Sequence, residues 1–236
     1  DILYLSSNQQ IAQSVNGTAS TLSGGTGTDT LDFSGYGSGV TVDLDAGTST
    51  AIINGITSFE NIVGSSYADT LLGDTGDNGI SGGSGADSIE GSAGNNTLTG
   101  GAGNDTIVGG TGADSISGGD DNDELEAGID TGLNTIDGGS GNDSIVASSS
   151  TGSNTLTGGT GSDTIIAGTG DDLIDGGDGT SGIDGSDTIE AGDGADTILG
   201  SNGSDIIFGG SSSGNDSDID VLRYVDENEG LSVTIT

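Results

Sequence analysis

The feature that most constrains this sequence is a run of nine-residue units between Gly82 and Glu126. Five units follow one another without a gap: GGSGADSIE, GSAGNNTLT, GGAGNDTIV, GGTGADSIS and GGDDNDELE. Their shared order is Gly-Gly-x-Gly-x-Asp-x-(Leu/Ile)-x, and we number these places one to nine. A fixed period of this length predicts a stack of repeated structural units rather than a conventional globular domain.

Fifteen such units cover residues 64 to 208, and each has Leu or Ile at place eight. Because side chains alternate across a strand, we expect this one aliphatic column to point inward and form a thin core. Its members are Leu71, Ile80, Ile89, Leu98, Ile107, Ile116, Leu125, Ile136, Ile145, Leu156, Ile165, Ile174, Ile189, Ile198 and Ile207.

Three units are longer than nine residues: 127–137, 147–157 and 176–190. Each insertion falls in the turn, so the strand residues keep their register and the added residues should protrude from one edge of the stack. The first two are successive even-numbered units when counting starts at residue 64. We therefore expect them to lie above one another.

The residue types within a unit indicate a cation site. Glycine at places one, two and four permits positive φ and leaves backbone carbonyls accessible. A carboxylate at place six supplies the hard anionic oxygen that calcium prefers. Three strand residues follow, so each unit is one turn plus one short strand, or half a coil.

These motifs resemble the RTX family of calcium-binding nonapeptide repeats, over Gly64 to Phe208 and in one isolated unit at Gly24–Asp32. The resemblance implies an all-β fold, a right-handed parallel β-roll (a β-helix or solenoid) with two units per coil. It also implies several calcium ions, each held between two turns on the same edge by backbone carbonyls and the place-six carboxylate.

Carried onto this chain, the resemblance implies two sets of calcium ligands. The carboxylates are Asp29, Asp69, Asp87, Asp105, Asp114, Asp123, Asp143, Asp163, Asp172, Asp187, Asp196 and Asp205. The backbone carbonyls are those of Gly83, Gly85, Gly101, Gly103, Gly119, Gly139, Gly141, Gly159 and Gly161.

Place six differs between the two edges. Odd-numbered units carry Asp throughout, whereas even-numbered units include four asparagines: Asn78, Asn96, Asn134 and Asn154. An uncharged amide oxygen binds calcium more weakly than a carboxylate does. We therefore expect a continuous calcium ladder on the odd edge, and weak or missing sites on much of the even edge, where amide-to-backbone hydrogen bonds could hold the turns instead.

The chain divides into four predicted segments. Residues 1–23 read as an incoming strand and turn, and residues 24–63 as the first unit followed by a wider coil. The β-roll occupies 64–210, and 211–236 form a C-terminal cap or the start of another module. Phe33, Tyr36 and Phe59 lie in the wider coil and should cover the end of the stack, whose last strands would otherwise expose unpaired backbone groups.

Composition excludes several classes of function. Apolar residues make up 29% and aromatic residues 3%, too little for a conventional enzyme core. A net charge of −37 with one basic residue gives no surface for nucleic acid or anionic lipid, and no apolar run is long enough for membrane insertion.

The sequence also lacks most of the side chains that catalytic sites use. His, Cys and Lys are absent, which removes zinc sites and the usual activated nucleophiles. Aspartate pairs could act on a glycoside, and Arg223 could serve as the base of a polysaccharide lyase. However, there is no Trp to stack a sugar, and Arg223 has acidic neighbours in DIDVLRYVDENEG that favour a local ion pair. We expect no enzyme activity.

The function expected is a calcium-dependent structural module of a secreted or cell-surface bacterial protein, such as a surface-layer (S-layer) subunit, filament or adhesin. The resemblance implies export by a one-step, type I secretion system. The alternative is the calcium-folding secretion module of an exported enzyme whose catalytic domain lies elsewhere. Candidate partners besides calcium are surface polysaccharide, neighbouring domains and further copies of the chain.

Place nine suggests a surface for such assembly. On odd units this outward column includes Val108, Val146 and Ile166, whereas even units carry mostly Ser, Thr and Asp there. An exposed apolar stripe on an acidic protein can mark a contact surface. We therefore expect these three residues to form one patch.

Overall fold

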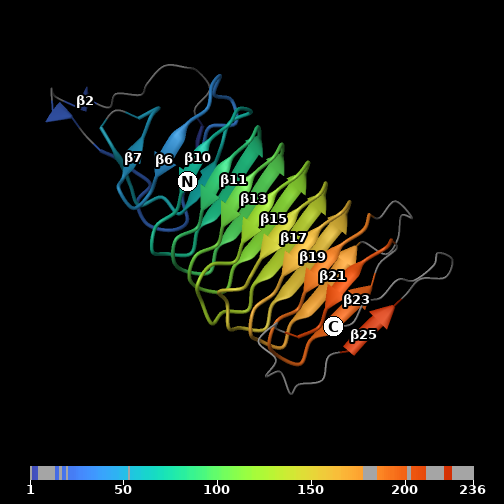
Figure 1. Ribbon diagram of the computed structural model, residues 1–236. Helices are drawn as coiled ribbons and strands as arrows, with labels where there is room; N and C mark the ends of the chain where they lie inside the picture. The colour runs from blue at the N-terminus through green and yellow to red at the C-terminus, as the bar shows by residue number, and fades with distance from the viewer. Residues whose placement is uncertain are drawn as a thin grey trace.

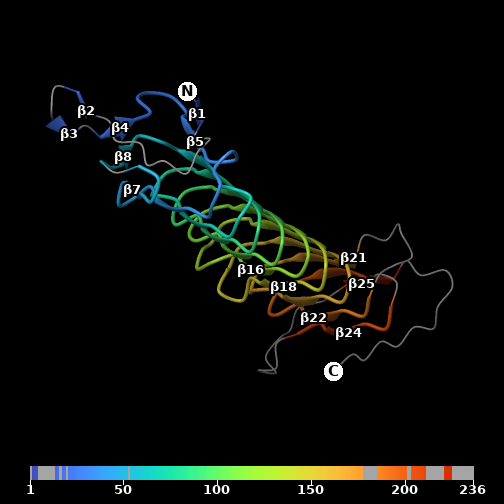
Figure 2. The same ribbon diagram turned by 90° about the horizontal axis from the view of Figure 1, so that it is seen from above.

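The computed structural model describes residues 2–4, 14–15, 18–19, 21–52, 54–177, 185–200, 203–210 and 221–224. Every regular element in these ranges is a β-strand, and the strands form a long stack of coils (Figure 1). Viewed from above, the coil outlines follow one another along the stack (Figure 2). The predicted all-β parallel roll is confirmed.

Two long sheets form the sides of the roll. Sheet A has the order β1 (Ile2–Tyr4), β5 (Thr30–Asp32), β9 (Asn61–Val63), β11 (Gly79–Ser84), β13 (Thr97–Ala102), β15 (Ser115–Asp120), β17 (Thr135–Ser140), β19 (Thr155–Thr160), β21 (Leu173–Gly177), β23 (Thr197–Gly200), β25 (Val221–Tyr224). Sheet B has the order β24 (Ile206–Phe208), β22 (Thr188–Glu190), β20 (Thr164–Ile166), β18 (Ser144–Val146), β16 (Glu124–Glu126), β14 (Thr106–Val108), β12 (Ser88–Glu90), β10 (Thr70–Leu72), β6 (Thr41–Asp43), β7 (Thr48–Ser49).

Even-numbered units contribute the strands of sheet A and odd-numbered units those of sheet B. Successive strands within each sheet are parallel, apart from the antiparallel pair β6 and β7. Two small sheets lie in the N-terminal part: β2 (Ser14–Val15) with β3 (Thr18–Ala19), and β4 (Leu22–Ser23) with β8 (Ile56–Thr57). None of the chain that the structure describes forms a helix long and apolar enough to cross a membrane.

The core is the predicted place-eight column. In sheet B, Leu71 lies beside Ile89 and Ile89 beside Ile107, and the same register continues from coil to coil. All fifteen residues of the column are at most 3% exposed. One aliphatic side chain per half coil is therefore enough to fill the interior, because the two sheets face each other closely.

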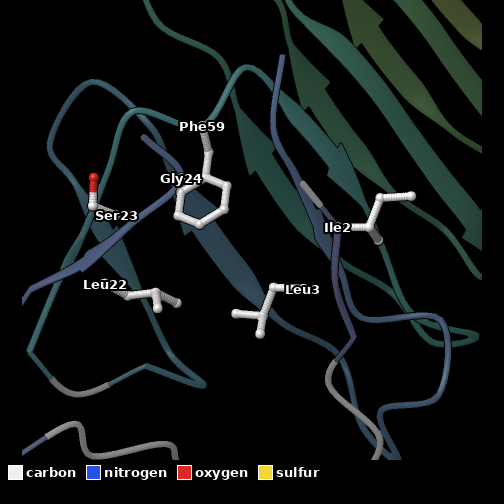
Figure 3. Close-up of a pocket in the computed structure, with 6 residues that line it drawn as sticks. All are labelled: Ile2, Leu3, Leu22, Ser23, Gly24 and Phe59. Atoms are coloured by element: carbon white, nitrogen blue, oxygen red, sulfur yellow. The ribbon is translucent and has the colours of Figure 1, made fainter. Parts of the chain in front are cut away.

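The N-terminal coil is wider and carries the aromatic residues. Phe33, Tyr36 and Phe59 are buried, and the rings of Phe33 and Tyr36 meet edge to face with centroids 6.3 Å apart. A cavity of about 180 Å³ opens beside Phe59, and Figure 3 shows Leu3, Leu22 and Phe59 around it. Its lining is mostly apolar, so this end of the molecule packs side chains and offers few oxygen ligands.

The strands of sheet A are longer than the sequence suggests. β11, β13, β15, β17 and β19 each have six residues and run through places one to three of the following unit, where the sequence pattern predicts a turn. Glycine pairs with glycine there, as in Gly83 with Gly101. A Cβ on Gly101 would overlap the carbonyl oxygen of Gly83, so only glycine allows the two backbones to approach this closely.

Each end of the described chain adds a strand to sheet A. In the register of the repeats, β1 places Leu3 beside Leu31, and β25 places Leu222 beside Ile198. Both Leu3 and Leu222 pack against the core. These strands lie in the segments expected to be an incoming strand and a C-terminal cap.

The predicted insertions do stack, because Thr151 N donates to Asp130 O at 3.0 Å. Residues 178–184 of the third long unit lie outside the described residues.

The three apolar residues predicted to form a patch at place nine are not all direct neighbours. Val108 lies beside Glu126 in sheet B, and Glu126 lies beside Val146, so a carboxylate separates the two valines. Val146 and Ile166 are direct neighbours and are both half-buried. Of the three predicted residues, only Val146 and Ile166 are therefore neighbours in sheet B.

Candidate calcium sites along the turns

The turns form two edges that join the sheets. The odd edge leads into sheet B and includes residues 82–87, 100–105, 118–123, 138–143 and 158–163. The even edge leads into sheet A and includes residues 73–78, 91–96, 109–114, 127–134, 147–154 and 167–172. All twelve predicted carboxylates are buried, with at most 4% of each residue exposed. The four even-edge asparagines are buried to a similar degree, at 1–3%.

One oxygen of the place-six side chains forms a hydrogen-bonded ladder along the odd edge. The backbone N–H of Asp69 donates to Asp87 Oδ1 at 2.8 Å, that of Asp87 to Asp105 Oδ1 at 2.7 Å, and that of Asp105 to Asp123 Oδ1 at 2.8 Å. Each coil is thus bonded to the next through a side chain as well as through the sheets. Hydrogen bonds to a carboxylate are stronger than those between neutral groups.

The second carboxylate oxygen is what distinguishes these turns. Oδ2 is buried and accepts no hydrogen bond in five residues: Asp87, Asp105, Asp114, Asp123 and Asp143. A buried charged oxygen without a donor is costly, and in native proteins it calls for a specific explanation such as a bound ion.

Glycine at place one leaves a space next to this oxygen. A Cβ on Gly82 would overlap Asp87 Oδ2 and would lie 2.8 Å from the carbonyl oxygen of Gly100 in the next coil. A Cβ on Gly100 would likewise overlap Asp105 Oδ2 and lie 2.7 Å from Gly118 O. A carboxylate oxygen and a carbonyl oxygen from successive coils therefore face one small space, which suits a hard cation with oxygen ligands.

The nine glycines predicted to supply carbonyls all lie on the odd edge, and all have positive φ, between 106° and 142°. Their carbonyls lie between successive turns: a Cβ on Gly103 would overlap Gly85 O, and one on Gly161 would overlap Gly141 O. Asp121 takes place four in one turn with φ of 77°. Backbone oxygens are thus available in every gap of this edge.

Side chains alone do not complete a site. Among the residues that the structure describes, no three acidic side chains converge on a common point. A cation bound within these turns would take the remaining ligands from the carbonyls, as the repeat pattern predicts.

Electrostatics favour a cation at the same positions. The pKa of Asp123 is raised to about 7 and that of Asp87 to about 6, chiefly by burial and also by neighbouring carboxylates, while a backbone hydrogen bond acts in the opposite direction on each. Burial likewise raises the pKa of Asp105, Asp114 and Asp143. Each shift shows that the charged carboxylate is disfavoured until a positive charge is supplied.

Two predicted carboxylates are instead satisfied by the protein. Asp69 accepts Val40 N and Ser65 Oγ at Oδ1, and Ser65 N at Oδ2. Asp172 Oδ2 accepts Gly168 N at 3.3 Å. These turns differ from those with an unpartnered Oδ2.

Sequence reasoning missed a second ladder at place five. Asn122 Oδ1 accepts Asn142 N at 2.7 Å, and Asn142 Oδ1 accepts Ser162 N at 2.8 Å. Ser162 Oγ accepts Ser186 N at 2.9 Å. The recurrence of Asn, Asp and Ser at place five was a usable signal, since these side chains commonly bond to backbone groups.

Comparison with known families agrees with this geometry. The family described as the RTX calcium-binding nonapeptide repeat (4 copies) matches residues 63–98, 90–125, 99–132, 130–150, 148–183 and 181–217, which together cover more than half of the chain. A search among curated proteins gave no significant match. The chain therefore belongs to the RTX calcium-binding nonapeptide repeat family, and its repeats bind several calcium ions.

Proposed function

We propose that this chain is a calcium-dependent structural module of a secreted or cell-surface bacterial protein, such as a surface layer, an extracellular filament or an adhesin. The observation that carries the proposal is the column of buried, unpartnered Oδ2 atoms at Asp87, Asp105, Asp123 and Asp143. The column runs along one edge of a rigid stack, so ions bound there would hold coil to coil.

The same column identifies the ligands we propose. Calcium would be held between successive turns by a place-six carboxylate, by the place-one carbonyl of the next coil, as in Asp87 with Gly100, and by carbonyls at places two and four. The positive charge of calcium would offset the negative charge of these buried carboxylates. The chain itself supplies the spacing, because glycine keeps the gap open.

A structural role suits the shape of the roll. Its interior is one aliphatic column, and its sides are two long sheets. A uniform stack of this kind is long and stiff, and each coil contacts only its neighbours.

A location outside the cell suits the chemistry. RTX repeats are typical of secreted bacterial proteins, and extracellular calcium modules bind with dissociation constants of roughly 0.1–1 mM. With a charge of −37 and few apolar residues, the chain resembles disordered sequences when no cation is bound. Calcium outside the cell would then drive folding after export.

Calcium counting on the purified chain tests the ligand set. Equilibrium dialysis at saturating calcium should show fewer bound ions for Asp105→Asn than for wild type, because Asn keeps the ladder oxygen and removes the unpartnered one. An equal number of ions in the two proteins would reject the odd-edge ligand set. Glu124→Gln, which changes an exposed residue of sheet B, is the matched control and should keep the wild-type count.

A further inference from the structure

The four even-edge asparagines keep the ladder that aspartates form on the odd edge. Asn78 N donates to Asn96 Oδ1 at 2.9 Å, Asn96 N to Asp114 Oδ1 at 2.7 Å, and Asn134 N to Asn154 Oδ1 at 3.2 Å. In Asn96, Asn134 and Asn154, Oδ1 therefore accepts the same inter-coil hydrogen bond as in the odd-edge aspartates, whereas Asn78 Oδ1 accepts Asp74 N of its own turn at 2.9 Å. The difference lies in the second atom, which is an oxygen in Asp and an NH₂ group in Asn.

In each asparagine this NH₂ group donates to an oxygen of the turns. Asn78 Nδ2 donates to Glu60 O at 3.0 Å. Asn96 Nδ2 donates to Ala93 O and Gly94 O, both at 3.4 Å. On the odd edge, the corresponding Oδ2 atoms of Asp87, Asp105, Asp123 and Asp143 have no donor.

The two stacked insertions extend this arrangement. Asn134 Nδ2 donates to Asp130 Oδ2 at 3.2 Å and to Asn154 Oδ1 at 3.1 Å. Asn154 Nδ2 donates to Gly152 O at 3.0 Å and to Asp172 Oδ1 at 3.1 Å. Amide hydrogens thus connect three successive coils.

A buried serine completes the set of donors. Ser150 is fully buried, and its hydroxyl donates to Asp130 Oδ1 at 2.9 Å. Asp130 also accepts Gly132 N at 3.1 Å. The carboxylate that the first insertion adds to this edge therefore accepts hydrogen bonds from the protein at both of its oxygens.

Place one changes on the same coils. Ala127 and Ala147 are buried, at 0% and 1% exposure, where the odd edge always has glycine. On the odd edge, a Cβ at place one would fill the space between Oδ2 and the next carbonyl. The methyl groups of these alanines stand at the equivalent place, which leaves less room for an ion.

We propose that the turns centred on Asn78, Asn96, Asn134 and Asn154, which we call the amide seam, bind no calcium and are closed by their own N–H and O–H donors. A cation there would face amide hydrogens or, at Asn78, an amide oxygen that already accepts Asp74 N. Asp172 belongs to the seam, since both of its oxygens accept protein hydrogen bonds. The inference rests on the proposed role of the odd-edge carboxylates as calcium ligands.

Asp114 is the exception on this edge. Like Asn78 and Asn96 it belongs to a unit with glycine at place one, here Gly109, but its Oδ2 is buried without a hydrogen-bond partner. A Cβ on Gly109 would lie 2.6 Å from that Oδ2 and 2.5 Å from Ala127 O, so the oxygen-lined space of the odd edge is present here. Asp114 is therefore a calcium ligand within an otherwise metal-free stretch.

The test compares two double variants on the same two coils of the full chain. Asn134→Ala with Asn154→Ala removes the seam, and Asp123→Ala with Asp143→Ala removes two odd-edge carboxylates. We expect the seam variant to keep the wild-type number of bound calcium ions in equilibrium dialysis while its melting temperature falls. The odd-edge variant should lose ions. A seam variant that loses calcium would overturn the inference.

Ser150→Ala provides a milder test in case the double variant does not fold. We expect an unchanged calcium count and a lower melting temperature in calcium, with exposed Ser153→Ala as the control that changes neither. A lower calcium count in Ser150→Ala would place an ion in the seam and refute the proposal. If instead the odd-edge variant keeps its full count, the proposed ligand set fails, while the seam variant still decides the seam.

Discussion

Removing calcium should unfold the roll, and the odd edge shows why. Asp87, Asp105, Asp123 and Asp143 occupy successive coils of one stack, and the strands of a sheet lie about 4.8 Å apart. Two charges at that spacing repel by about 1 kcal/mol in bulk water and about 3.5 kcal/mol at an effective dielectric constant of about 20. The carboxylates are at most 3% exposed, which favours the larger value.

Over the neighbouring pairs of this column, the repulsion comes to roughly 3–10 kcal/mol, as large as the whole stability of a typical domain, about 5–15 kcal/mol. Far-UV circular dichroism and small-angle scattering at pH 7.5 should show an expanded, disordered chain in excess chelator. Calcium at roughly 0.1–1 mM should restore the β-sheet signal and the compact rod. A full β-sheet signal in excess chelator would refute the reasoning.

Three further predictions concern acidity, one carboxylate and assembly. Because the folded-state pKa values of Asp87 and Asp123, about 6 and 7, lie above the ordinary value of 3.8, their charge destabilises the metal-free roll as pH rises from about 4 to 7. Lowering the pH from 7.5 to about 4 without calcium should therefore increase the β-sheet signal in circular dichroism, and a signal that falls or stays flat would contradict this. Asp105→Ala removes a 2.7 Å ladder bond and an unpartnered oxygen, so the calcium midpoint of folding should rise about tenfold, or about 1.4 kcal/mol; an unchanged midpoint would exclude Asp105 as a ligand. Val146→Glu with Ile166→Glu should reduce any calcium-dependent self-assembly in light scattering while the roll stays folded, and assembly equal to wild type would show that this pair is ordinary solvent-exposed strand.

The core and the register of the roll could be predicted because they repeat in the sequence. Leu or Ile at place eight gives the inward column, and parity of the unit number gives the sheet to which each strand belongs. The positions of the four asparagines on one edge follow from the same count.

The contacts between coils could not be predicted in the same way. The ladder hydrogen bond joins Asp87 N to Asp105 Oδ1, 18 residues apart. Because the insertions change the spacing, it spans 20 residues from Asp123 to Asp143 and 24 residues from Asp163 to Asp187. Which oxygens find donors depends on these contacts. The hydrogen bonds to Asp69, for example, come from Ser65, which replaces the usual glycine at place two, and from Val40, which lies before the repeats.

The alternation of units between the two sheets limits how the length of this protein can change. Deleting one nonapeptide, such as 100–108, would move every later unit to the opposite edge. The later odd-edge aspartates would then follow the even-edge asparagines at place six. Place-one glycines would likewise lie next to place-one alanines. Deleting a whole coil, such as 100–117, would leave each side continuous. Gene duplication and engineering should therefore lengthen or shorten this array in steps of two units, and chains that have gained or lost a single unit should show a fault in their metal ladder at that point.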